Sequence, residues 1–145
     1  MGELHWASAT ELARSLETNE VSSVEITQSL IDRAEAIEGE LQAYLLPTAD
    51  RALADAGAAD ERRSAGKALS AYDGIPIAYK DLFVTKGITS TSGSKILAGY
   101  VPPYDATVVA RCSQAGLPLL GKLNMDEFAM GSSGENSGYQ LTKNP

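Results

Sequence analysis

The chain has 145 residues and a formal net charge of -7, which argues against direct binding to phosphate backbones or anionic membranes. A single cysteine and a single histidine exclude an internal disulfide and a Cys/His zinc cluster. The sequence contains no run of eighteen apolar residues, so no membrane span is predicted. The hydrophobic content of 43% is ordinary for a soluble domain. We therefore expect a cytoplasmic protein that makes no membrane contact.

Residues 1–68 predict a helical scaffold. The patterns Ser8–Glu11 and Ser22–Glu25 each fit a capping box, in which a serine and a glutamate three residues later satisfy the first amides of a helix. Behind the second box, apolar residues recur at spacings of three and four, and we expect Ile26, Leu30 and Ile37 among them to be buried on one face. Thr48 is expected to cap a third helix that ends within residues 60–67, where Arg62 and Arg63 are interpreted as part of a solvated loop.

Residues 69–145 change to a pattern of strand, loop, helix and strand. An apolar run at 74–80 predicts a strand, and Asp105 is expected to cap a helix that carries Cys112 on its core face and ends at Gly116. A second apolar run at 117–122 predicts another strand. Two strands joined through a helix indicate a parallel βαβ unit, whose ligands gather beyond the carboxyl ends of the strands.

Lys80 and Lys122 stand at the ends of these two strands. A lysine is almost never buried without a partner or a purpose, and desolvation disfavours the ammonium form. Lys80 could therefore be a neutral base near pH 7. The alternative is that its amine extends to solvent and pairs loosely with Asp81.

After the second strand, residues 124–130 predict a weak helix, and residues 131–138 form a loop rich in glycine and serine. The amides and hydroxyls of this loop could line a ligand, but a plain flexible connector fits the composition equally well. The loop has neither the ending of a phosphate-binding loop nor the spacing of a dinucleotide fingerprint.

Several long segments together resemble one family. They are Asp73–Asp81, Val101–Val109, Gly121–Ser133 and Glu135–Ser137, and they are similar to the amidase signature family. Within that family, Asn124–Glu127 followed by Phe128–Ser133 most resembles the A subunits of the amidotransferases that act on glutamyl-tRNA(Gln) and aspartyl-tRNA(Asn). The implied fold is α/β, with amino-terminal helices followed by the first strands of a mixed, largely parallel sheet covered by helices.

The resemblance implies hydrolysis of glutamine by a triad of two serines and a lysine. Lys80 matches the family's lysine, which accepts a proton from a bridging serine, and that serine activates a nucleophilic serine. The loop residues Met130, Gly131, Ser132 and Ser133 are expected to shape the substrate side of the pocket. No cofactor or metal is expected in this part of the enzyme.

The resemblance also implies partners. The B and C subunits of the amidotransferase would complete a heterotrimer in which a partner binds the tRNA, uses ATP and Mg²⁺ to activate the misacylated glutamyl or aspartyl group, and receives the released ammonia. Both triad serines follow this stretch in relatives, so we expect residues 1–145 to be the amino-terminal portion of one longer amidase domain and to be inactive alone. Two alternatives stay open: an amidase of the same family that acts on a small amide, and a non-catalytic fragment that only binds partners.

Overall fold

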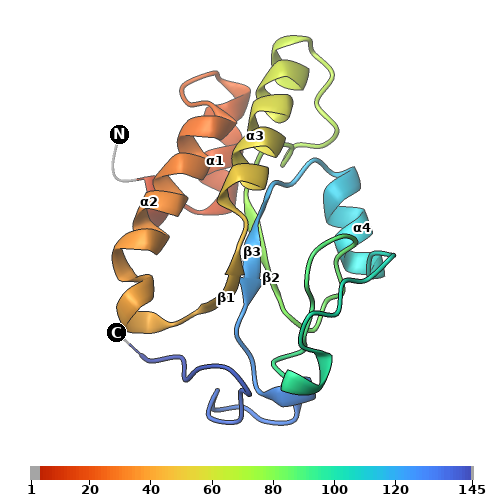
Figure 1. The fold of residues 1–145 in the computed structure, drawn as a ribbon. Helices are drawn as coiled ribbons and strands as arrows, with labels where there is room; N and C mark the ends of the chain where they lie inside the picture. The colour runs from red at the N-terminus through yellow and green to blue at the C-terminus, as the bar shows by residue number, and fades with distance from the viewer. Residues whose placement is uncertain (1–3, 145) are drawn as a thin grey trace. The chain divides into compact units, whose positions relative to one another are not determined.

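The computed structural model describes residues 4–144, and its helices and strands are labelled in Figure 1. The α-helices within this range are α1 (Ala9–Glu17), α2 (Ser23–Leu41), α3 (Ala49–Ser64) and α4 (Thr107–Gln114). The strands are β1 (Tyr44–Pro47), β2 (Ile77–Lys80) and β3 (Leu119–Leu123). Short 3-10 turns lie at Leu4–Trp6, Lys95–Leu97 and Glu127–Ala129. No helix in the described range is long and apolar enough to cross a membrane.

The three strands form a mixed sheet in the order β1-β3-β2, so β3 is central. β1 pairs antiparallel with β3, with Tyr44 opposite Leu123. β2 runs parallel to β3, because Ile77 donates its amide to the carbonyl of Pro118 and Asp81 donates further along to that of Leu123. The sequence predicted the β2-α4-β3 unit and the α/β class, and both are confirmed, whereas β1 was not predicted.

Both predicted capping boxes are present. The Ser8 amide donates to Glu11 Oε2 over 2.8 Å, and the Glu11 amide donates back to Ser8 Oγ. Ser22 and Glu25 make the same reciprocal pair at the start of α2. These contacts span three residues, so the local sequence is sufficient to specify them.

Two other predicted caps are wrong, because each side chain binds a distant partner. Thr48 precedes α3 but makes no side-chain cap, and its hydroxyl donates to the carbonyl of Leu119 over 2.7 Å. Asp105 accepts the amide of Lys86 over 2.6 Å, and α4 begins only at Thr107. The predicted end of α4 is confirmed, since Gly116 follows the helix with φ of +85°.

The two arginines expected in a solvated loop lie instead in the last turn of α3, which continues to Ser64. Arg62 donates two hydrogen bonds to the buried carboxylate of Asp73. Arg63 donates to the carbonyls of Asp73 and Ala71. The interpretation as a solvated loop is wrong because the carboxylate and carbonyls of a distant segment offer acceptors that the local sequence does not show.

Contacts divide the chain into two compact units, one made of residues up to 36 with 48–77 and 112–120, the other of 37–47 with 78–111 and 121 onward. The first has an apolar core of Leu12, Leu16, Val21, Ile26 and Ile75. Of the α2 residues expected to be buried, Ile26 is fully buried, whereas Leu30 and Ile37 are half-buried and Ile31 is buried in addition. Cys112, expected in the core, is half-buried.

The division of one amidase domain into a scaffold (residues 1–68) and an α/β core (residues 69–145) stays a prediction.

Candidate active site around Lys80

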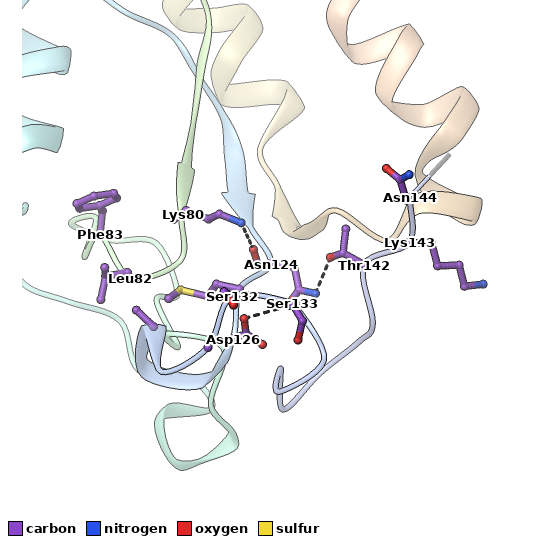
Figure 2. Close-up of a pocket in the computed structure, with 14 residues that line it drawn as sticks. Lys80, Leu82, Phe83, Asn124, Asp126, Ser132, Ser133, Thr142, Lys143 and Asn144 are labelled. Atoms are coloured by element: carbon purple, nitrogen blue, oxygen red, sulfur yellow. Dashed lines mark hydrogen bonds between the residues drawn. The ribbon is translucent and has the colours of Figure 1, made fainter.

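A cavity of about 620 Å³ opens at the carboxyl end of β2, entirely within the second unit (Figure 2). Its lining includes Lys80, Leu82, Phe83, Asn124, Met125, Asp126, Ala129, Gly131, Ser132, Ser133, Gly134, Thr142, Lys143 and Asn144. Lys80 points its amine toward the end of β3, where Nζ donates to the carbonyl of Asn124 over 2.7 Å. Lys80 is exposed, so the expectation that it is buried is wrong. Its place at the end of β2 is as predicted.

The buried lysine is Lys122 of the central strand, which is fully closed off from solvent. Its Nζ lies 3.1 Å from Asp81 Oδ1 and donates to the Phe83 carbonyl over 2.9 Å and to Ser90 Oγ over 2.7 Å. These three acceptors match the three N–H bonds of an ammonium group. Burial lowers the pKa of Lys122, and the Asp81 carboxylate counteracts part of that effect.

Lys122 and Ser90 are also in contact, but Lys122 Nζ donates to Ser90 Oγ, whose own hydroxyl donates to the Ile88 carbonyl over 3.2 Å, so the lysine is not placed to take the serine proton. Both side chains are at most 1% exposed, and neither lines the cavity beside Lys80. A substrate in that cavity would not reach the Ser90 hydroxyl. We therefore assign the contact between Lys122 and Ser90 a structural role. The amines that line the cavity are those of Lys80 and Lys143.

Asp126 organises the loop on the other side of the cavity. Its carboxylate accepts the amides of Asn136 over 2.8 Å and Gly134 over 3.0 Å. These amides lower the pKa of Asp126, and the charge of Lys80 adds to the effect. Gly131 packs so closely that a Cβ there would lie 2.6 Å from Asp126 Cγ. The loop is therefore tied to the strand end and is not a loose connector.

Asn124 connects the end of β3 to the last described residues. Its side-chain amide donates to the Gln140 carbonyl over 2.8 Å and to Thr142 Oγ1 over 2.9 Å, and its Oδ1 accepts from Ser137. The weak helix predicted over 124–130 is only the turn Glu127–Ala129, where Phe128 has φ of +53°. A regular helix cannot continue through that conformation.

The structure brings four of the five predicted site residues to this cavity, namely Lys80, Gly131, Ser132 and Ser133. Met130 does not line it and is 73% exposed. Ser133 Oγ donates to Glu135, whose side chain does not line the cavity. Sequence reasoning missed Asn124 and Asp126, although polar residues directly after a strand are a usual sign of a ligand site.

These groups can bind a polar molecule and move a proton. The Lys80 amine is the candidate proton acceptor, and the amides and hydroxyls of the 131–134 loop can bind polar substrate atoms. Among the described residues no group of three or more metal-ligating side chains is placed to hold a metal ion. The chemistry that this arrangement fits is acid–base catalysis by side chains.

The family model described as Amidase matches residues 25–145, which include every residue that lines the cavity. The chain belongs to the amidase family. It is 52% identical over its whole length to the A subunit of the glutamyl-tRNA(Gln) amidotransferase of Chloroflexus aggregans, of which it covers 30%. It is 53% identical over 143 residues, or 99% of the chain, to that of Geobacter sulfurreducens, covering 29%. This amidase-family chain thus spans about a third of the length of these relatives.

Solved structures show the same relationship. The chain is 36% identical, with a TM-score of 0.90, to a structure described as a vestigial protein complex that reveals the origins of an s-triazine catabolic enzyme, matching 96% of this chain and 31% of the other. It is 26% identical, with a TM-score of 0.81, to a peptide amidase from Stenotrophomonas maltophilia, with coverages of 94% and 31%. The fold of this amidase-family chain is therefore that of amidase enzymes.

Proposed function

We propose that this chain belongs to the glutamine-hydrolysing A subunit of a tRNA-dependent amidotransferase. The support is the identity of 50% or more with the A subunits of glutamyl-tRNA(Gln) amidotransferases from several bacteria, against 36% for the s-triazine-related structure. In this proposal glutamine is hydrolysed to glutamate and ammonia, and the ammonia converts Glu-tRNA(Gln) to Gln-tRNA(Gln), and also Asp-tRNA(Asn) to Asn-tRNA(Asn) if that charged tRNA is accepted.

Lys80 carries the proposal, because its amine opens into the cavity while one N–H is held by the carbonyl of Asn124. In its neutral form, an amine oriented in this way directs its lone pair away from that carbonyl. It can then take a proton from a bridging serine, which in turn takes one from the nucleophile. Both serines are proposed to lie outside residues 1–145, because Ser132 and Ser133 precede the family's serine-bearing segment.

The loop held by Asp126 is proposed to face the substrate. Gly131, Ser132 and Ser133 line the cavity, so their backbone and hydroxyl groups are available to a carboxamide. Met130 would contribute less, since its side chain lies outside the lining. No cofactor is proposed to act here. The tRNA, ATP and Mg²⁺ are proposed to bind the B subunit of the amidotransferase, with the C subunit completing the heterotrimer.

The test measures ammonia release from glutamine by the natural gene product that contains these residues. Lys80→Met and Lys80→Arg should each lower the rate by about a thousandfold or more, since a methionine has no amine and an arginine does not deprotonate. Lys86→Arg is the matched control, because Lys86 is exposed and outside the cavity. Glutaminase activity retained in Lys80→Arg would exclude Lys80 as the base.

A second candidate is an amidase that acts on a small or peptide amide without tRNA partners. The likeness to the Stenotrophomonas maltophilia peptide amidase favours this alternative. Comparing glutamine with a peptide amide and a short acyl amide distinguishes the two, since the proposed function requires the highest kcat/KM for glutamine.

Residues 1–145 alone should release no ammonia, since they hold a base without its serines. Turnover by this segment alone would contradict the placement of the nucleophile, and inactivity of the whole gene product toward every amide would favour a binding role.

A further inference from the structure

The buried pair Lys122–Asp81 connects three segments, and neither of its residues lines the cavity. Lys122 belongs to β3, Asp81 follows the last residue of β2, and Ser90 lies in the segment after it. The side chain of Lys122 is 0% exposed and that of Asp81 is 2% exposed. A buried ion pair is costly to form unless its remaining hydrogen bonds are satisfied, and such satisfied pairs are suited to fixing one arrangement of the chain.

The carboxylate oxygen Oδ2 and the backbone carbonyl of Asp81 both accept hydrogen bonds from one short segment, residues 91–92. Its Oδ2 accepts both the amide of Thr91 over 2.7 Å and the Thr91 hydroxyl over 2.5 Å. Its carbonyl accepts the amide of Ser92, and its own amide donates to the Leu123 carbonyl over 3.0 Å. Asp81 therefore ties the end of β2 to both β3 and the 91–92 segment.

Lys80 stands next to Asp81 and is held from the same two strand ends. Neighbouring side chains at the end of an extended strand point to opposite sides, which agrees with the exposed Lys80 and the buried Asp81. On one side, Lys80 Nζ reaches the carbonyl of Asn124. On the other, Asp81 reaches Lys122, two residues before Asn124. The two contacts clamp the end of β2 against the end of β3.

We propose that Lys122 and Asp81 are positioning residues that fix the place of the Lys80 amine in the cavity. The inference rests on the proposed role of Lys80 as a base. A base must lie within hydrogen-bond reach of the proton it accepts, so a small shift of the β2 end would reduce turnover more than substrate binding. Both residues are buried and neither lines the cavity, so the pair acts on Lys80 without touching the substrate.

The main test compares kcat and KM for ammonia release in the natural gene product. Lys122→Met leaves the Asp81 carboxylate buried without its cation, and it should lower kcat by about a hundredfold while KM stays within about twofold. Lys86→Met removes an exposed lysine of the same unit and should change neither constant. Thr91→Val is a milder variant that removes one hydrogen bond to Asp81, and it should lower kcat several-fold.

The double variant Lys122→Met/Asp81→Asn separates positioning from stability. It leaves no unpaired charge, and an asparagine can still accept from Thr91, so it should unfold at a higher denaturant concentration than Lys122→Met. Its kcat should nevertheless stay low. Recovery of kcat together with stability would show that the pair only holds the fold, and would overturn the inference. If Lys122→Met does not fold, Thr91→Val replaces it as the single variant. A kcat of Thr91→Val equal to that of the wild type would then overturn the inference.

A second measurement does not require any turnover. The rate at which a small amine-directed reagent modifies Lys80, relative to Lys86, should change several-fold in Lys122→Met or Thr91→Val, because the contact of Nζ with Asn124 is disturbed. An unchanged ratio would overturn the inference even if the wild-type protein releases no ammonia. That absence of ammonia release would itself count only against the proposed function.

Discussion

The guanidinium of Arg62 meets the carboxylate of Asp73 through two hydrogen bonds, from Nε over 2.9 Å and from Nη2 over 2.6 Å. Asp73 is fully buried and also accepts the amide of Leu69. The pair therefore joins the last turn of α3 to the segment that leads into β2. A bidentate ion pair of this kind is stronger than a single hydrogen bond between neutral groups, because it has two hydrogen bonds and both partners are charged.

Replacing Arg62 with methionine should lower the free energy of unfolding by about 2–4 kcal/mol, because a buried carboxylate is left without its cation. Urea denaturation of the gene product measures this change. Arg51→Met is the control, since Arg51 pairs with Asp55 on the solvent side of the same helix, where an ion pair contributes about 0.3–0.5 kcal/mol. Equal losses in the two variants would contradict the importance of the buried pair.

The same contact predicts a loss of stability in acid. Burial raises the pKa of Asp73, but the hydrogen bonds from Arg62 and Leu69 together with the charges of Arg62 and Arg63 outweigh it and leave the pKa lowered. The folded state therefore binds its proton at lower pH than the unfolded state. The contribution is fully present above about pH 4 and is lost as the pH falls through the folded-state pKa. Asp73→Asn should reduce the slope of unfolding free energy against pH in this range, and an unchanged slope would contradict the assignment.

Gly116 should tolerate no side chain. Its φ is +85°, and a Cβ would lie 2.0 Å from Asp73 Oδ1. Gly116→Ala should therefore destabilise the protein by more than the roughly 1–2 kcal/mol that the backbone conformation alone costs. Gly57→Ala is the opposite case, since Gly57 lies inside α3 with no atom near its Cβ position, and this change should stabilise by about 0.5–1 kcal/mol. Thermal unfolding measures both effects: the midpoint temperature should fall in Gly116→Ala and rise in Gly57→Ala.

Ile26 and Leu30 lie one turn apart on α2 but differ in burial. Ile26 is 0% exposed within the apolar core, whereas Leu30 is half-buried at its edge. Ile26→Ala should cost about 2–5 kcal/mol of unfolding free energy, and Leu30→Ala clearly less, because fewer contacts and a smaller cavity are involved. A larger loss for Leu30→Ala in chemical denaturation would show that this face is covered more deeply than the described contacts indicate.

Asp126 should affect substrate binding more than turnover. Without its carboxylate, the amides of Gly134 and Asn136 lose their acceptor and the loop beside the cavity is released. Asp126→Ala should therefore raise KM for glutamine, the proposed substrate, by about tenfold, the equivalent of about 1.4 kcal/mol, with a smaller change in kcat. Lys86→Ala is the control, because Lys86 is exposed and does not line the cavity. A fall in kcat alone would indicate a direct role for Asp126 in catalysis.

Features that depend on neighbours in the sequence could be predicted from it. The boxes at Ser8 and Ser22 close over three residues, and the β2-α4-β3 unit follows from two apolar runs around one helix. The apolar run at 74–80 likewise predicted Lys80 at the end of a strand. These are local properties, because short-range hydrogen bonds and hydrophobic periodicity determine them.

The tertiary structure decided which of two similar lysines is buried. In the sequence, Lys80 and Lys122 both end apolar runs, but β1 pairs with β3 from residues far away and makes β3 the central strand. Lys122 is thereby enclosed and needs Asp81, whereas Lys80 on the outer strand β2 opens to the cavity. Burial depends on the atoms that surround a side chain in space, and segments distant in the sequence supply those atoms.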